Sequence, residues 1–309
     1  MDRETIDTVR RNRCIIGLLL LPLCVYGESL FEAGLHGGLA GWTAQPVYVN
    51  RSVGLHAGAQ LYYSYLSPSV FGFRTGVTFD RHAAYFCKQN YEDGYSTVDV
   101  EDDQMVIDYT IGSLWEQHSM WSVGVPVQLA LTYRRFTLYA GPKVVFPFSG
   151  KWKQEIKQAA LSVYYPAYDN RVYDSYPLAA SSNFEQNNNG STALPKVQWW
   201  LAAELNYALP LNTWATHYRS YLMVGVYFDY CLTRVAPARS EAECLIMLTD
   251  TRDGLPLQRL YTSVAEGQRQ GRKMVNNYAM FDVGIKLSYA ISPFDAHKAA
   301  RKSCNCRNW

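Results

Sequence analysis

Apolar and polar residues alternate with a period of two along much of this chain. The clearest run covers residues 281–291, in which the residues between the apolar ones are polar or small. A period of two predicts a strand with one apolar and one polar face. The run has about the length that a tilted strand needs to cross a bilayer. Its apolar members are Phe281, Val283, Ile285, Leu287, Tyr289 and Ile291.

Similar runs recur and predict eight strands, an even number as in bacterial single-chain membrane barrels. Two further stretches, 105–115 and 156–165, are candidates for additional strands. The pattern therefore predicts an all-β fold, an antiparallel up-and-down transmembrane β-barrel of eight strands, with ten as the alternative. The eight strands are placed at residues 31–42, 51–65, 70–86, 121–134, 135–148, 196–210, 217–234 and 277–291.

The connections between these strands alternate in length. Short connections lie at residues 66–69, 134–135 and 211–217, and long ones at 87–120, 149–195 and 235–276. Only the first connection, near 43–50, is short where a long one is due. In outer-membrane barrels the short turns are periplasmic and the long loops external. We therefore expect three long external loops, with both chain ends in the periplasm.

A soluble β-sandwich or lipocalin-like barrel also alternates, but it buries its apolar face inside. Periodicity alone does not distinguish the two arrangements. The apolar faces here are almost uninterrupted, whereas the opposite faces hold charges and small residues that suit a narrow lumen. This favours the membrane barrel. The small residues include Gly34, Gly38, Gly54, Gly58, Gly72 and Gly76.

The N-terminus has the pattern of a secretory signal. Arginines precede an apolar stretch at residues 14–26, and small residues lie near its end. The stretch is short for a membrane-spanning helix and contains Pro22. Acylation of Cys24, as in a lipoprotein, is a further alternative. The predicted division is a signal peptide (1–27), an outer-membrane barrel (28–292) and a basic periplasmic tail (293–309).

Composition fits export to a membrane. Charged residues make up 18% of the chain, below the usual quarter of soluble domains. The 24 tyrosines and 8 tryptophans suit strands and the membrane–water interface. A net charge of +2 gives no indication of nucleic-acid binding.

The polar faces predict the content of the lumen. Eight strands enclose a space that side chains just fill, and the alternation places four basic and four acidic residues there, with His36, His56, Gln60 and Gln128. A balanced set predicts a buried ion-pair network and a sealed lumen rather than a diffusion pore. The eight charged residues are Arg74, Asp80, Arg134, Lys143, Glu204, Asp229, Asp282 and Lys286.

The long connections are the expected place for binding. The first is acidic, and its run at residues 99–103 is either a cation-binding cluster or simply a solvated loop. The second is rich in Tyr, Asn and Ser, which predicts adaptable polar binding or a disordered tip. Cys87 and Cys244 both fall on the external side, and a disulfide between them is a hypothesis.

We find no catalytic motif in the sequence. The chain has no Gly-x-Ser-x-Gly elbow, no His-Glu-x-x-His motif and no phosphate-binding loop. His118 has serines near it, but a strand sends the side chain of adjacent Ser119 to the opposite face. We expect no enzyme, no cofactor and no metal, with a lipid-modifying enzyme as the remaining alternative.

Three stretches, SVGLHAGAQLYYSYL, VFGFRTGVTF and RFTLYAGPKVVFPFSGK, resemble the small outer-membrane β-barrel family common in Bacteroidota, related to OmpX- and PorT-like barrels. The motifs are the segment Gly72-Phe73-Arg74-Thr75-Gly76 and the pair Gly141-Pro142. The resemblance covers about residues 28–292. It implies a Gram-negative outer-membrane location and the barrel fold, and it brings no catalytic signature.

Together these features predict a sealed outer-membrane barrel that acts as a surface binding or structural protein through its external loops. The expected partners are outer-membrane lipid and lipopolysaccharide, with periplasmic or outer-membrane proteins as further candidates, and the barrel is expected to be monomeric. The alternative is a narrow porin or a subunit of a transport or secretion assembly.

Overall fold

The computed structural model describes residues 28–43, 48–67, 70–98, 102–172, 184–192, 194–211, 219–234, 244–249, 258–269, 272–275 and 279–292. The predicted signal peptide, the predicted basic tail and residues 99–101 of the acidic run lie outside these ranges. Within the described ranges, no helix has the length and apolar character needed to cross a bilayer.

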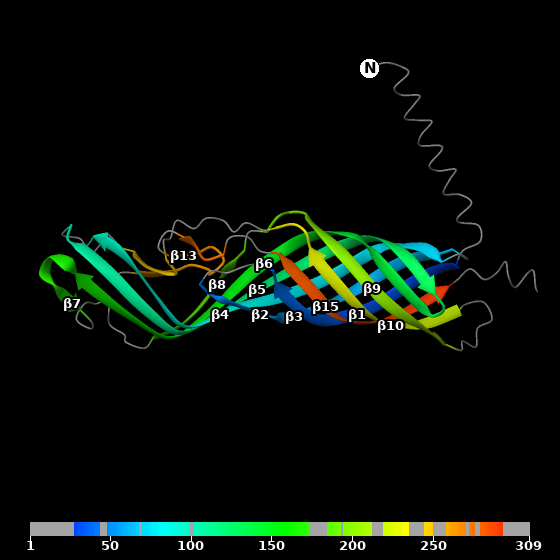
Figure 1. The fold of residues 1–309 in the computed structure, drawn as a ribbon, viewed down its shortest axis with the longest axis horizontal. Coiled ribbons are helices and arrows are strands. Elements are labelled where there is room, and N and C mark those ends of the chain that lie inside the picture. Colours follow the sequence, from blue (N-terminus) through cyan, green and yellow to red (C-terminus); the bar gives the residue numbers. More distant parts are fainter. Residues whose placement is uncertain are drawn as a thin grey trace, which may run out of the picture.

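Eight antiparallel strands close into a barrel (Figure 1). Each pairs with the next in chain order, and β1 pairs with β15 to complete the ring. Closure pairs the backbone of every barrel strand on both sides, as a lipid environment requires. The predicted eight-stranded up-and-down barrel is confirmed. The strands are β1 (Glu28–Trp42), β3 (Gly54–Leu66), β4 (Phe71–Val98), β5 (Gln104–Tyr133), β6 (Phe136–Tyr165), β9 (Gln198–Leu211), β10 (Arg219–Cys231) and β15 (Met280–Ser292).

The barrel is apolar outside and polar inside. Leu35, Leu129 and Ile285 point outward and are 68%, 72% and 71% exposed. Polar residues at alternate positions of the same strands, such as His36 and Lys286, point into the barrel. A continuous apolar outer surface is stable in lipid and not in water. The chain therefore forms a membrane-spanning barrel rather than a soluble one.

Three neighbouring strands run far beyond the other five. β4, β5 and β6 have 28, 30 and 30 residues, whereas the remaining barrel strands have 13 to 15. Their excess forms a sheet that projects to the left in Figure 1, away from the end where β1 begins and β15 ends. Short strands widen this sheet: β2 (Asn50–Ser52) pairs with β4, and β7 (Asn170–Val172) and β8 (Phe184–Ser191) pair with β6.

We call this projecting part the head. It comprises the described residues within 48–52, 84–118, 150–192 and 244–275. Two of the three expected long loops are thus mostly strand. Residues 105–115 and 156–165 continue β5 and β6 and add no strand to the barrel, so the ten-strand alternative is wrong. The third connection contributes the hairpins β11 (Ile246–Thr249) with β12 (Gln258–Tyr261) and β13 (Gln268–Arg269) with β14 (Arg272–Lys273).

The alternation of inward and outward side chains reverses phase inside the head. On β5 the buried positions are even-numbered from Ala130 back to Leu114. They are odd-numbered from Ile111 back to Met105, toward the far end of the head. The reversal lies at one row of the sheet, formed by Asn90, Gly112 and Gln158, which drop out of the strand pairing. Asn90 and Gln158 have positive φ angles of 51° and 54°. A left-handed residue turns the strand over, as in a β-bulge, so that the next residues face the other way.

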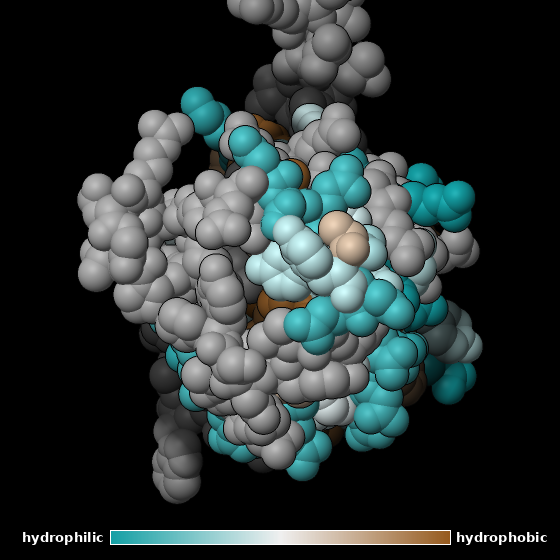
Figure 2. Space-filling view, turned by 90° about the vertical axis from the view of Figure 1, so that its left-hand side faces the viewer, coloured by the Kyte–Doolittle hydropathy of each residue, from teal (hydrophilic) through white to brown (hydrophobic). Residues whose placement is uncertain are grey.

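The hydrophobic core of the head is continuous with apolar residues inside the adjoining end of the barrel, such as Trp42, Trp200 and Met280. The described residues of the segment 244–275 cover the inner face of the projecting sheet, and the apolar area buried between them stabilises the head. Figure 2, viewed from the far end of the head, shows mainly hydrophilic side chains among the described residues. Fully buried members of this core include Tyr91, Ile107, Tyr109, Ile111, Ile156, Leu245, Ile246, Val264 and Met274.

The hypothesis of a disulfide between Cys87 and Cys244 is wrong, because neither cysteine forms one. Cys87 pairs in the sheet with Trp115, whose side chain faces outward. Cys244 lies buried against the inner face, and its thiol donates to the Ile246 carbonyl at 3.0 Å. The sheet itself separates the two side chains.

Candidate functional site

The half of the lumen nearest the start of β1 and the end of β15 holds a charge-balanced cluster, which we call the lower cluster. Arg74 Nη2 lies 2.6 Å from Glu204 Oε1, and its Nη1 lies 3.8 Å from Glu32 Oε2. Lys286 Nζ contacts the same two carboxylates, at 2.5 Å from Glu204 and 2.8 Å from Glu32. Two cations therefore face two anions. Such charge-assisted bonds offset the cost of burying the groups.

Arg74 is also held by neutral neighbours. Its guanidinium lies between the rings of Tyr62 and Tyr139, 4.2 and 3.7 Å from their centroids. It donates twice to Gln128 Oε1, from Nε at 2.9 Å and from Nη2 at 2.6 Å. Arg74 is fully buried. Side chains from across the barrel thus meet on one arginine and fill the lumen at this level.

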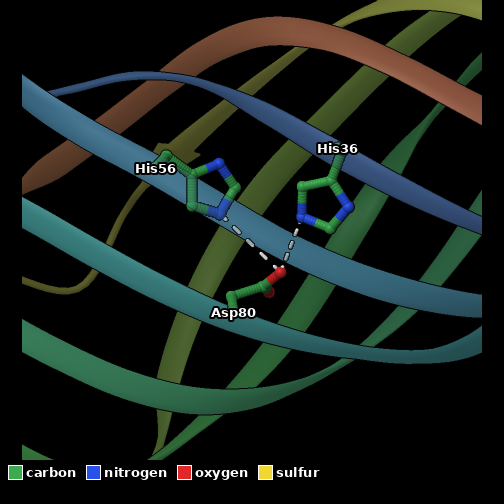
Figure 3. A group of neighbouring side chains, drawn as sticks. All are labelled: His36, His56 and Asp80. Atoms are coloured by element: carbon green, nitrogen blue, oxygen red, sulfur yellow. Dashed lines mark hydrogen bonds and ion pairs between the residues drawn. The ribbon is translucent and has the colours of Figure 1, made fainter.

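A second group of polar side chains, which we call the upper cluster, lies closer to the head. Asp80 Oδ1 accepts from His36 Nε2 at 2.8 Å (Figure 3), and its Oδ2 accepts from Thr78 at 2.6 Å. Lys143 Nζ bridges Asp80 and Asp229, at 2.9 Å from each. Both oxygens of Asp80 are therefore engaged.

A glycine makes the contact between His36 and Asp80 possible. His36, Gly58 and Asp80 occupy one row on three adjacent strands. A Cβ atom at Gly58 would lie 2.5 Å from both Asp80 Oδ1 and His36 Nε2. Only glycine leaves space for side chains two strands apart to meet above the strand between them.

The upper cluster continues toward β15. The rings of His56 and His82 stack with centroids 4.5 Å apart and an interplanar angle of 11°. His82 Nδ1 lies 2.9 Å from Asp282 Oδ2, and His56 Nδ1 lies 2.6 Å from the Tyr227 hydroxyl. His56 Nε2 faces Asp80 Oδ1 at 3.7 Å (Figure 3).

The structure brings together seven of the eight charged residues predicted for the lumen and excludes one. Arg134 lies in the exposed turn between β5 and β6, with φ of 57°, and its guanidinium lies 5.4 Å from the Tyr133 ring. The predicted strand was extended into the turn that ends it. The seven residues inside are Arg74, Asp80, Lys143, Glu204, Asp229, Asp282 and Lys286.

One acidic residue and one histidine of the lumen, Glu32 and His82, were absent from the prediction. The alternation contained the signal, because Glu32 shares its face with His36 and His82 shares its face with Asp80. With these changes the predicted charge balance is wrong. The described lumen holds five carboxylates and three permanently charged cations: Glu32, Asp80, Glu204, Asp229 and Asp282 against Arg74, Lys143 and Lys286.

Apolar side chains close the barrel above the upper cluster. Trp42 and Phe86 stack with centroids 5.4 Å apart, and Trp200, Met120 and Met280 are buried at the same level. A cavity of about 20 Å³ beside Trp42, Met120 and Met280 has room for roughly one water molecule. The barrel interior is therefore filled by charged groups below and by an apolar layer above.

Glu116 forms a buried polar centre inside the head. Its carboxylate accepts from the Val264 amide at 2.8 Å, the Ser263 hydroxyl at 2.7 Å and Gln154 Nε2 at 2.9 Å. His118 Nε2 lies 2.6 Å from the same carboxylate. One glutamate thereby fastens the covering segment to the inner face of the projecting sheet.

A second carboxylate, Asp93, anchors the outer part of the head core. The hydroxyls of Tyr91 and Tyr109 donate to Asp93 Oδ2 at 2.9 and 3.2 Å, and Arg269 Nε lies 3.8 Å from its Oδ1. Burial, together with the nearby Asp93 charge, raises the pKa of both tyrosines well above the ordinary value. Both hydroxyls therefore remain protonated donors.

A groove of about 460 Å³ crosses the outer face of the head. Trp115 is 46% exposed there, with the Tyr85 ring edge-on at 6.2 Å. Aromatic rings pack against the C–H faces of ligands, and amide and charged groups bond their hydroxyls. The lining residues are Tyr85, Trp115, Gln117, Lys153, Gln154, Glu155, Asn187, Asn188 and Asn189.

Neither a family model nor a curated protein sequence matches this chain. Among solved structures, Neisserial surface protein A is 8% identical with a TM-score of 0.29, covering 86% of this chain and 96% of its own. Ail of Yersinia pestis, in complex with the heparin analogue sucrose octasulfate, is 10% identical with a TM-score of 0.25, covering 84% and 98%. Similarity at this level says nothing about what the chain binds, and the resemblance to Bacteroidota barrels stays a prediction.

Proposed function

We propose that this chain is an outer-membrane anchor protein: a sealed barrel that holds a folded binding head at the cell surface. The observation that carries the proposal is the continuity of β4, β5 and β6, each of which runs as one strand from the lipid-facing band into the head. Function on such scaffolds resides in the parts that face the outside. In this orientation the chain ends lie in the periplasm.

The filled lumen supports an anchor rather than a channel. Full-length protein reconstituted in planar bilayers is expected to show no stable conductance, because the lower cluster and the apolar layer that contains Trp42 both obstruct the lumen. Single-channel recording over a range of voltages measures this. A steady open channel would instead support the narrow-porin alternative.

We propose that the groove binds the sugar and phosphate groups of outer-leaflet glycolipid. Phe79, Trp121 and Phe148 form an aromatic contact group where the apolar band ends, with Phe79 5.3 Å from Trp121 and 5.8 Å from Phe148. Gln117 in the groove lies four residues further along β5, which places it about 10 Å above that group on a tilted strand. This is the level of glycolipid head groups.

Charge supports the same partner. Outward-facing Arg81 pairs with Trp121 of the aromatic group, Lys151 lies closer to the groove, and Lys153 lines the groove itself. Arg81 is held with its guanidinium 5.6 Å from the Trp121 ring. Cations at this height suit the phosphates of a glycolipid, which they bind through charge-assisted hydrogen bonds.

Trp115→Ala is expected to weaken binding of deacylated lipopolysaccharide oligosaccharide about tenfold, because the exposed ring supplies much of the apolar contact. Isothermal titration of the detergent-solubilised protein measures the affinity. Tyr168→Ala is the matched control, since Tyr168 is another exposed aromatic of the head, 65% exposed and outside the groove. Equal affinities for wild type and Trp115→Ala would contradict the assignment of the groove.

A further inference from the structure

We propose that the upper cluster of the lumen binds one divalent transition-metal ion, of the zinc type, through His56, His82 and Asp282. The donor atoms of these three side chains lie within 4.8 Å of one another. Two imidazoles and one carboxylate are a common ligand set for zinc and related ions. This site is separate from the head and from the binding proposed for it.

The first support is an imbalance of charge. The lower cluster pairs two carboxylates with two cations, whereas the upper cluster holds Asp80, Asp229 and Asp282 with three histidines and one permanently charged cation, Lys143, among the described residues. All of these groups are buried, and uncompensated charge in such a place is costly. A divalent cation supplies the two missing positive charges.

The second support is a set of buried donor atoms without hydrogen bonds. Both oxygens of Asp282, His56 Nε2 and His82 Nδ1 make no hydrogen bond of good geometry with the described residues, although His82 Nδ1 lies 2.9 Å from Asp282 Oδ2. Asp282, His56 and His82 are only 0%, 2% and 1% exposed. Native proteins rarely leave such atoms unsatisfied, and each is an atom through which these residues bind metals.

The third support is that the second ring nitrogen of each histidine contacts a hydroxyl group. His56 Nδ1 bonds the Tyr227 hydroxyl at 2.6 Å, and His82 Nε2 lies 3.4 Å from Ser122 Oγ. Metal-binding histidines are typically oriented by such a bond at the second nitrogen. Zinc ligands lie about 2.0–2.2 Å from the ion and about 3.3 Å from each other. His82 Nδ1 and Asp282 Oδ2, 2.9 Å apart, are already this close, and His56 Nε2, within 4.8 Å of both residues' donor atoms, has to approach them.

The neighbouring triad of His36, His56 and Asp80 (Figure 3) fits a cation less well. Asp80 already accepts from His36, Thr78 and Lys143, and the Lys143 ammonium beside it repels a cation. His56 belongs to both triads. Asp80 Oδ1 lies 3.7 Å from His56 Nε2 and is therefore close to the proposed site.

The test uses the full chain without a polyhistidine tag, unfolded with chelator and refolded in detergent with Co²⁺ as the probe, because the filled lumen restricts entry to the folded barrel. We expect one Co²⁺ per folded chain by elemental analysis, with visible d–d absorption from nitrogen and oxygen ligands. Zn²⁺ added during refolding should compete for the site. Folding is checked by the shift between heated and unheated protein on a denaturing gel.

His82→Ala and Asp282→Asn are expected to weaken Co²⁺ binding more than about tenfold, and Tyr227→Phe, which frees the His56 ring, about tenfold. His118→Ala is the control, because His118 bonds Glu116 in the head, outside the cluster. Folded wild-type chain that takes up neither Co²⁺ nor Zn²⁺ would overturn the proposal, with protonated histidines then supplying the charge. An equal loss in His118→Ala would also overturn it.

Discussion

Replacing Arg74 with alanine is expected to lower the free energy of unfolding of the barrel by about 3–5 kcal/mol. The substitution leaves Glu32 and Glu204 facing Lys286 alone, so that one carboxylate becomes an uncompensated buried charge. It also removes the side chain that fills the space between Tyr62 and Tyr139. Both losses fall in the fully buried centre of the lower cluster.

Denaturant unfolding in lipid vesicles, followed by tryptophan fluorescence, measures this change. Arg134→Ala is the matched control, because it removes an arginine from the exposed turn, and we expect it to stay within about 0.5 kcal/mol of wild type. The double variant Arg74→Met, Glu204→Gln leaves one cation facing one carboxylate, and it should recover part of the loss. A wild-type unfolding free energy for Arg74→Ala would contradict the role of the lower cluster.

Replacing Glu116 with alanine is expected to release the covering segment of the head while the barrel stays folded. The Val264 amide, the Ser263 hydroxyl and Gln154 Nε2 would lose a shared charged acceptor in a buried site. Hydrogen bonds to a charged group contribute about 1.5–3 kcal/mol each, and unsatisfied buried donors are costly. This loss of free energy is larger than the stability expected of the short hairpins β11–β12 and β13–β14, because isolated two-stranded hairpins are only marginally stable.

Limited proteolysis of the folded protein measures this release as faster cleavage between residues 244 and 275. Glu92→Ala is the control, since Glu92 is an exposed glutamate of the same sheet. The gel shift of the heated barrel should be the same in both variants. Protection of the segment in Glu116→Ala, equal to wild type, would show that the apolar core alone holds the head together.

The alternation of apolar and polar residues was sufficient to predict the barrel, because a lipid environment requires an apolar outer face. Every outward position of a membrane strand must be apolar, as in Val283, Ile285 and Leu287, and inward positions are free to be charged. The same rule identified seven charged lumen residues. It failed at Arg134, where the strand ends in a turn. The left-handed conformation of Arg134 cannot be predicted from the pattern of apolar residues.

The head escaped prediction for a related reason. Above the membrane, the strands are no longer constrained by lipid, and their outer face becomes polar, as with Gln117 and Lys153. The reversal at Asn90, Gly112 and Gln158 then shifts the period by one residue. Polar composition and a broken period together resemble a loop, although the hydrogen bonding of the sheet continues.

The sequence by itself determined the fold class, the number of barrel strands and most of the side chains that face the lumen, because a two-residue period and a bilayer leave few alternatives. Only the tertiary structure decided which of those side chains meet. The pairing of His82 with Asp282, and of Arg74 with Glu204, depends on the register of strands distant in sequence and on small residues between them. The division into a balanced lower cluster and a carboxylate-rich upper cluster follows from that register.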